Sequence, residues 1–197
     1  MRVSAFSRPP LVLGYYFPDW TSGVAALAAI ATSEATLPSL VLRDPAETAF
    51  HPTADMPPER LAAYLGRVYG YRADRVCRAS IGFEGSRWQV RRQRSRVGRL
   101  VRRHGGVAAG RQQDDPRAER GTETCEAFAP WSRLTDLRDG VLASAHRAFA
   151  SAGGRGTIRC RLSHAHHSGA RLRFAVTCEP PPRWSLRQAC LEQGVEV

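Results

Sequence analysis

Two short stretches near the C-terminus have a large apolar residue or a cysteine at every second position. Residues 157–162 and 172–176 each place apolar side chains at the even-numbered positions and arginine at most of the positions between them. A period of two is the signature of a β-strand with one buried face. The two stretches therefore predict an antiparallel hairpin whose loop lies around residues 166–169. The apolar set is Ile158, Cys160, Leu162, Leu172, Phe174 and Val176, and the outward set is Arg159, Arg161, Arg171 and Arg173.

An amphipathic helix precedes this hairpin. Ser132 is a suitable N-cap, apolar residues recur at spacings of three and four up to Phe149, and Gly153 follows. Similar reasoning predicts helices over 23–33, 57–69 and 185–191. A further amphipathic helix over 87–103 stays an open possibility. The remaining expectations are an extended arm or edge strand in the opening residues, which carry Pro9, Pro10 and Pro18, a short hairpin of 76–83 with 87–90, and irregular proline-containing chain over 34–57.

These elements predict an α+β fold, with helices packed on short antiparallel hairpins and with irregular Pro-rich and Arg-rich connections. Residues 105–123 carry paired Gly, Gln-Gln and Asp-Asp-Pro and no large apolar side chain. We therefore expect an N-terminal helical and basic region over 1–104, a flexible linker over 105–123, and a helix-plus-hairpin unit over 124–197.

The chain is strongly basic, with a formal net charge of +11 over 197 residues. All 29 basic residues are arginine, which suggests a GC-rich coding sequence and lowers the functional weight of the charge. Five widely spaced cysteines form no disulfide framework, and no apolar run reaches the ~18 residues of a membrane span. A cytoplasmic protein is the expectation.

The helix, the glycines and the hairpin together resemble a known family. Residues 139–149, then Gly153-Gly-Arg-Gly-Thr-Ile-Arg159, then 171–176 are similar to the ATP-binding domain of bacterial sensor histidine kinases. The resemblance covers about 45 residues. It implies a helix that carries a magnesium ligand, followed by two strands that lead into a glycine-rich nucleotide loop.

The chain departs from this family where the nucleotide chemistry would lie. Ala143 stands where the family has its magnesium-binding Asn, and a methyl group cannot bind a hard cation. The stretch 178–182, Cys-Glu-Pro-Pro-Pro, replaces the flexible glycines, and proline has a fixed φ and no N–H. The resemblance thus implies a degenerate ATPase domain with no cofactor, acting in signal transduction through contacts with a response-regulator-like or other signalling protein. No catalytic residue is predicted, and the chain is expected not to be an enzyme.

A nucleic-acid-binding protein is the first alternative. Eight of the seventeen residues from Arg87 to Arg103 are arginine, and guanidinium groups bind phosphates bidentately. RNA or DNA is the expected partner, and the other interpretation of this stretch is a solvated basic face. The candidate residues are Trp88, Arg91, Arg92, Arg96, Arg99 and Arg103.

Two further interpretations stay open. Cys160, His164 and Cys178 would share one face of the hairpin if residue 160 paired with residue 178, and thiolate and imidazole ligands suit zinc. Small buried cysteines and a polar loop explain the same residues. Residues 84–123 also combine Arg, Gly and Gln without periodicity, as a damaged reading frame without a defined function would.

Overall fold

We describe the protein from a computed structural model, which covers residues 11–33, 37–50, 58–111, 123–179 and 184–195. A single sheet of seven antiparallel strands runs through these residues, in the order β4-β1-β3-β2-β6-β7-β5. The α+β fold class is therefore confirmed. The strands are β1 (Leu11–Phe17), β2 (Leu40–Arg43), β3 (Cys77–Phe83), β4 (Val107–Arg111), β5 (Glu123–Pro130), β6 (Arg155–Ser163) and β7 (Gly169–Glu179).

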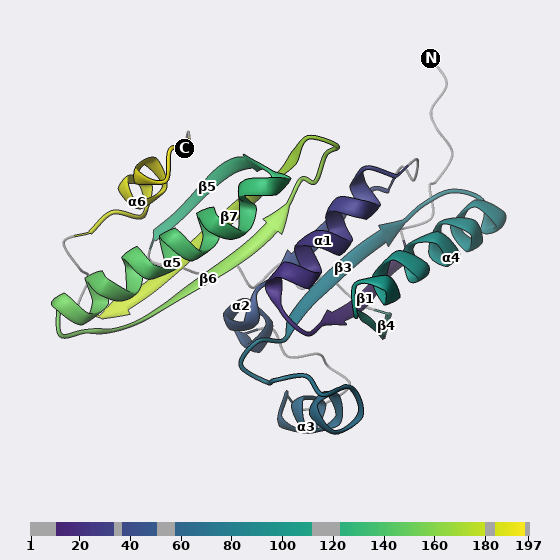
Figure 1. The fold of residues 1–197 in the computed structure, drawn as a ribbon, viewed down its shortest axis with the longest axis horizontal. Helices are drawn as coiled ribbons and strands as arrows, with labels where there is room; N and C mark the ends of the chain where they lie inside the picture. The colour runs from purple at the N-terminus through teal and green to yellow at the C-terminus, as the bar shows by residue number, and fades with distance from the viewer. Residues whose placement is uncertain (1–10, 34–36, 51–57, 112–122, 180–183, 196–197) are drawn as a thin grey trace, which may run out of the picture.

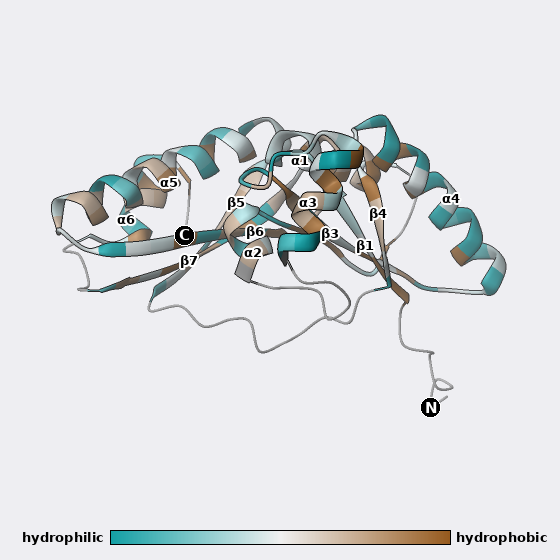
Figure 2. Ribbon diagram, turned by 90° about the horizontal axis from the view of Figure 1, so that it is seen from below, coloured by the Kyte–Doolittle hydropathy of each residue, from teal (hydrophilic) through white to brown (hydrophobic). Residues whose placement is uncertain are grey.

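The helices α1, α4, α5 and α6 form a layer over one face of the sheet (Figures 1 and 2). In this layer α5 packs on β5, β6 and β7, while α1 packs on β1, β2 and β3, and α4 lies beside α1 and β4. The helices are α1 (Trp20–Ala31), α2 (Pro45–Phe50), α3 (Pro58–Tyr69), α4 (Arg87–Arg103), α5 (Leu134–Ser151) and α6 (Leu186–Glu192), with a short 3-10 turn at Trp131–Arg133.

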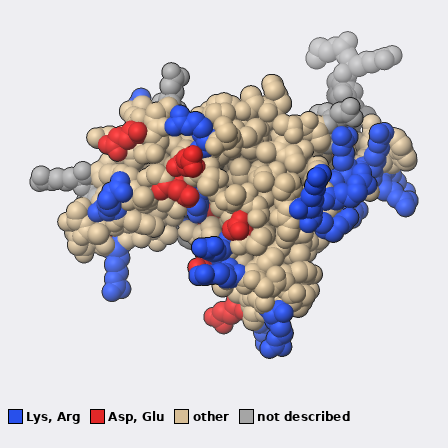
Figure 3. Space-filling model, in the orientation of Figure 1, with Lys and Arg blue, Asp and Glu red and all other residues tan. Residues whose placement is uncertain are grey.

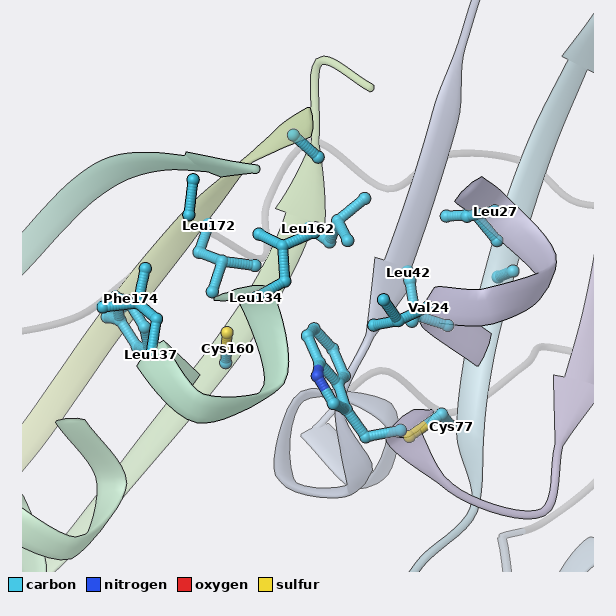
Figure 4. Packing of buried hydrophobic residues seen from close by; sticks show 14 of the residues in the cluster. Val24, Leu27, Leu42, Cys77, Leu134, Leu137, Cys160, Leu162, Leu172 and Phe174 are labelled. Atoms are coloured by element: carbon cyan, nitrogen blue, oxygen red, sulfur yellow. The ribbon is translucent and has the colours of Figure 1, made fainter. Parts of the chain in front are cut away.

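The C-terminal hairpin forms as its alternation predicts. Leu162 pairs with Leu172, Cys160 with Phe174, and Ile158 with Val176, and all six side chains are buried beneath α5. Figure 4 shows Leu134 and Leu137 of α5 pointing into this cluster. Phe174 is fully buried, so the hairpin and α5 share one core.

The predicted boundary at 105–123 does not separate two sheets. Strand β2, from the N-terminal region, pairs with β6 through Leu42 and Leu162. One cluster of buried side chains extends from Tyr15 to Cys190, and Figure 4 shows its members from both parts of the sequence. Residues 107–111 of the predicted linker form β4, which pairs with β1. The remainder of that linker, 112–122, lies outside the described residues.

Three local expectations are wrong. Residues 87–90 belong to α4 rather than to a hairpin, because Ser86 caps this helix and Gln89 completes a capping box. Strand β1 is internal, paired with β3 and β4, because its flanking prolines lie outside Leu11–Phe17. The stretch predicted to be irregular, 34–57, contains β2 and α2.

A smaller cluster holds α3 on the opposite face of the sheet, at the β1 and β4 end. Leu65 is buried against Tyr16, Tyr71 and Val76, with Val107 packed beside them. Gly70 ends the helix with a φ of +72°, the left-handed conformation that suits glycine at a helix C-terminus. This face therefore has its own helical cover at one end, whereas side chains over β5, β6 and β7 are mostly half-buried or exposed.

Candidate anion-binding site on the arginine face

Arginines line the sheet face opposite to the layer formed by α1, α4, α5 and α6. Because side chains alternate along a strand, the neighbours of the buried Leu42, Cys160 and Leu162 point to this second face. Arginines occupy such positions, next to buried core residues, in four adjacent strands. The arginine face consists of Arg43 on β2, Arg78 on β3, Arg159 and Arg161 on β6, and Arg173 on β7.

Four of these arginines stand directly opposite one another. Arg78 pairs with Arg43, Arg43 with Arg161, and Arg161 with Arg173. We call these four residues the arginine row; at the usual strand separation it spans about 14 Å. Tyr16 pairs with Arg78 at one end of the row, and Glu126 pairs with Arg173 at the other.

The arginine row is partly withdrawn from water. Arg43 and Arg78 are only 9% and 8% exposed, whereas Arg161 and Arg173 are half-buried. Arg43 donates a hydrogen bond of 2.8 Å to the hydroxyl of Ser80. Like charges placed directly opposite in a sheet repel one another, and burial strengthens that repulsion. The four guanidinium groups together give this part of the sheet face a positive potential.

Arg159 lies beside the row and is the most buried of the set, at 4% exposure. Its guanidinium is 3.6 Å from a carboxylate oxygen of Glu47 in α2. Arg171, two residues before Arg173, forms an exposed ion pair of 3.1 Å with Glu126. Glu47 and Glu126 therefore lie beside the basic area, each next to one of its arginines.

A second charged cluster lies on the helical side and joins the two halves of the sequence. Arg138 of α5 is 3.4 Å from Asp44, and its guanidinium carbon is 4.9 Å above the Trp20 ring. Asp44 is buried and accepts a hydrogen bond of 2.8 Å from the backbone N–H of Glu47. Burial raises the pKa of the Asp44 carboxyl, against the opposing effect of Arg138. This cluster holds α1, α2 and α5 together.

The thiol candidates for a metal site do not come together. Cys160 pairs with Phe174, and Cys178 pairs with Gly156, so the register differs from the one that the zinc interpretation assumed. The Nδ1 atom of His164 is 3.1 Å from the hydroxyl of Ser163. Among the residues that the structure describes, no group of three or more His, Cys, Asp or Glu side chains is placed to hold a metal ion.

The residues predicted to bind nucleic acid all lie on α4. Trp88, Arg91, Arg92, Arg99 and Arg103 are exposed, and Arg96 is half-buried. On the other side of this helix Val97 and Val101 are buried in the core. The damaged-frame interpretation is therefore wrong for this part of the chain, since residues 84–111 supply a capped helix, a strand and core side chains.

The comparisons with known proteins identify the fold. No family model matches the chain, and no curated protein matches its sequence. Solved structures of two enzymes do match the fold of this chain. Alkyldihydroxyacetonephosphate synthase, in two crystal forms, matches with TM-scores of 0.82 and 0.81 at 19% and 20% identity, over 98% of this chain and 41% of that one. Substrate-bound p-cresol methylhydroxylase matches with a TM-score of 0.53 at 15% identity, over 95% of this chain and 42% of that one.

The chain thus spans about two fifths of the length of these enzymes. The resemblance to the sensor-kinase ATPase domain is wrong, and with it the assignment as a non-catalytic, histidine-kinase-like signalling protein. The hairpin that suggested this resemblance is instead part of a seven-stranded sheet, and the helix α5 packs on that sheet. The response-regulator-like partner followed from that resemblance alone.

The arginine row could be found only in part from the sequence. The alternation in residues 157–162 and 172–176 predicts that Arg159, Arg161 and Arg173 point away from the core, and the register confirms this. The contributions of Arg43 and Arg78 were missed, because they depend on pairing between β2 and β6 across more than 100 residues of chain.

Proposed function

We propose that this chain is the substrate-covering part of a larger enzyme of the FAD-binding oxidase type, and that its arginine row binds the phosphate of the substrate. The observation that carries the proposal is the row itself, in which Arg78, Arg43, Arg161 and Arg173 follow one another across four neighbouring strands. The likeness in fold to alkyldihydroxyacetonephosphate synthase supports the choice of a phosphate ester.

The chemistry of the donors fits an anionic oxygen group. Each guanidinium carries five N–H donors in a planar fork and has no acceptor, which matches phosphate oxygens in a bidentate manner. Two neighbouring half-buried arginines, Arg161 and Arg173, stand at the accessible end of the row. We expect them to contact the phosphate first, with Arg43 and Arg78 adding to the positive potential from the other end of the row.

The same donors would also suit the pyrophosphate of FAD. A flavin, when bound, supplies the electron-transfer chemistry of this enzyme class, and we place it with the part of the enzyme that the present chain does not cover. What this chain provides is a fixed set of cations that orients the ligand. The five cysteines are not disulfide-bonded, which fits the cytoplasmic location that we include in the proposal.

Ligand-dependent thermal stabilisation tests this function. Dihydroxyacetone phosphate is the probe, and dihydroxyacetone is the matched ligand without charge. A ligand at 100 times its dissociation constant stabilises the folded state by about 2.7 kcal/mol, so the melting temperature should rise with the phosphate and stay constant with the neutral compound. FAD is titrated separately, and stabilisation by FAD but not by dihydroxyacetone phosphate would assign the row to the cofactor.

Two double variants show whether the row is responsible. Arg161→Gln with Arg173→Gln should weaken dihydroxyacetone phosphate binding at least tenfold, since a hydrogen bond to a charged group contributes about 1.5–3 kcal/mol. Arg147→Gln with Arg155→Gln removes the same charge from exposed positions outside the row and should leave binding unchanged. Equal weakening in both variants would show that net charge, rather than the row, attracts the ligand.

A further inference from the structure

The outer surface of α4 is a second basic area, on the opposite side of the molecule from the arginine row. Eight of its seventeen residues are arginine and none is acidic, against 29 arginines in the 197 residues of the chain. Figure 3 shows these side chains as a dense group of blue atoms over α4, with red atoms gathered elsewhere on this view. A uniform bias towards arginine in the coding sequence does not explain this concentration.

The helix presents this charge in a fixed way. Val97 and Val101 are buried, and Val90 and Leu100 pack against the core, so the apolar side of α4 is occupied by its own protein. The opposite side bears Trp88, Arg92, Ser95, Arg99 and Arg102, all exposed and spaced three or four residues apart. Seventeen residues of helix make this basic strip about 25 Å long.

An aromatic ring stands at the N-terminal end of the strip. Trp88 is 66% exposed, and the guanidinium carbon of Arg92 lies 5.5 Å from the centre of its ring. A tryptophan that is held by an arginine and open to solvent offers a flat surface on which a nucleic-acid base can stack. The remaining arginines of the strip supply cations for the phosphates that follow.

We propose that the outer face of α4 binds single-stranded nucleic acid, with Trp88 stacking on a base and Arg92, Arg99 and Arg102 binding successive phosphates. A lipid surface fits less well, because an interfacial helix inserts its apolar side into the bilayer and that side of α4 is packed against β3 and α1. Single strands fit better than duplexes, because their bases are free to stack. This surface is independent of the function proposed above.

Fluorescence anisotropy of the full chain with labelled oligouridylate of about 16 nucleotides tests the proposal. Arg92→Ala, Arg99→Ala and Arg102→Ala together should weaken binding at least tenfold at ~50 mM salt. They should also lower the slope of log affinity against log salt by about 2, because each phosphate contact on a single strand contributes about 0.7. The control changes three exposed arginines elsewhere, Arg147, Arg155 and Arg187, to Ala and should leave both quantities unchanged.

A tryptophan variant separates stacking from charge. Trp88→Ala should weaken binding about tenfold with the salt slope unchanged, and Trp88→Phe should restore most of the affinity. Three results would overturn the proposal: no binding at ~50 mM salt, equal loss in the two triple variants, or duplex DNA bound as tightly as the single strand. Binding to phosphatidylserine vesicles without binding to the oligonucleotide would likewise overturn it. Because every substituted side chain is exposed, an unchanged melting temperature confirms that each variant is folded.

Discussion

Removing the guanidinium of Arg138 should destabilise the whole molecule. Arg138→Ala leaves the Asp44 carboxylate, which is 1% exposed, without the cation that now stands 3.4 Å away. Breaking a buried ion pair in this way costs about 3–5 kcal/mol, and losing the contact with Trp20 adds about 0.5–2 kcal/mol. We therefore expect a loss of about 4 kcal/mol, a large share of the 5–15 kcal/mol typical of a folded protein.

Urea unfolding followed by tryptophan fluorescence measures this loss. Arg147→Ala, on the exposed side of the same helix, is the control and should change the free energy of unfolding by less than about 0.5 kcal/mol. The double variant Asp44→Asn with Arg138→Met should recover most of the stability, because neutral groups of similar size often replace a buried pair without loss. A loss below about 1 kcal/mol for Arg138→Ala would show that the cluster does not hold the fold together.

The same measurement tests the organisation of the chain. Arg138 and Asp44 come from the two regions that the sequence divides at 105–123, yet they meet within one core. If both regions unfold together, wild type gives one transition and Arg138→Ala shifts it as a whole. Two separate transitions in the wild-type protein would mean that the paired strands β2 and β6 join domains of independent stability.

Three further predictions concern the core, a glycine and pH. Phe174→Ala, at a fully buried position, should lower the free energy of unfolding by about 3–5 kcal/mol in the same urea experiment, and a loss below about 1 kcal/mol would contradict the packing described. Gly169→Ala should lower the melting temperature, because the new Cβ would collide with the backbone carbonyl oxygen of Ala129; an unchanged melting temperature would refute that contact. Because burial raises the pKa of Asp44 above 3.8, its protonated form favours the folded state, and this contribution decreases as pH rises through the raised value. The free energy of unfolding of wild type relative to Asp44→Asn should therefore fall as pH rises from about 4 through the raised pKa, and an increase over the same range would contradict the raised pKa.

Local pattern was enough to predict the elements whose apolar residues are regularly spaced. The hairpin of β6 and β7 and the helices α4 and α5 have periods of two or of three and four, and they appear close to the expected bounds. Strand β2 gave no such signal, because its four residues, flanked by Pro38 and Pro45, are too few to show a period. Yet β2 is the strand that connects the two halves of the sheet.

The wrong resemblance to the sensor-kinase ATPase domain also arose because the prediction used only local sequence patterns. A helix followed by a glycine turn and a hairpin is a local unit that occurs in many folds. Its presence therefore does not identify the fold of the whole chain. What distinguishes this protein is the order of strands on either side of that unit, with β2 beside β6 and β5 beside β7. Those pairings are long-range, and no window of the sequence contains them.

The arginines of α4 and those of the arginine face differ in the energetic cost of their surroundings. An exposed arginine on α4 is solvated by water, so a GC-rich coding sequence can place it at little energetic cost, and its function must be established by binding. An arginine at position 43, 78 or 159 is more than nine-tenths buried, and burying a charge is unfavourable unless opposite charge or hydrogen bonds offset it. Burial therefore constrains the arginines of the sheet more strongly than the exposed arginines of α4. For this reason we give the arginine row, with its three directly opposed arginine pairs, the greater weight in proposing what the protein binds.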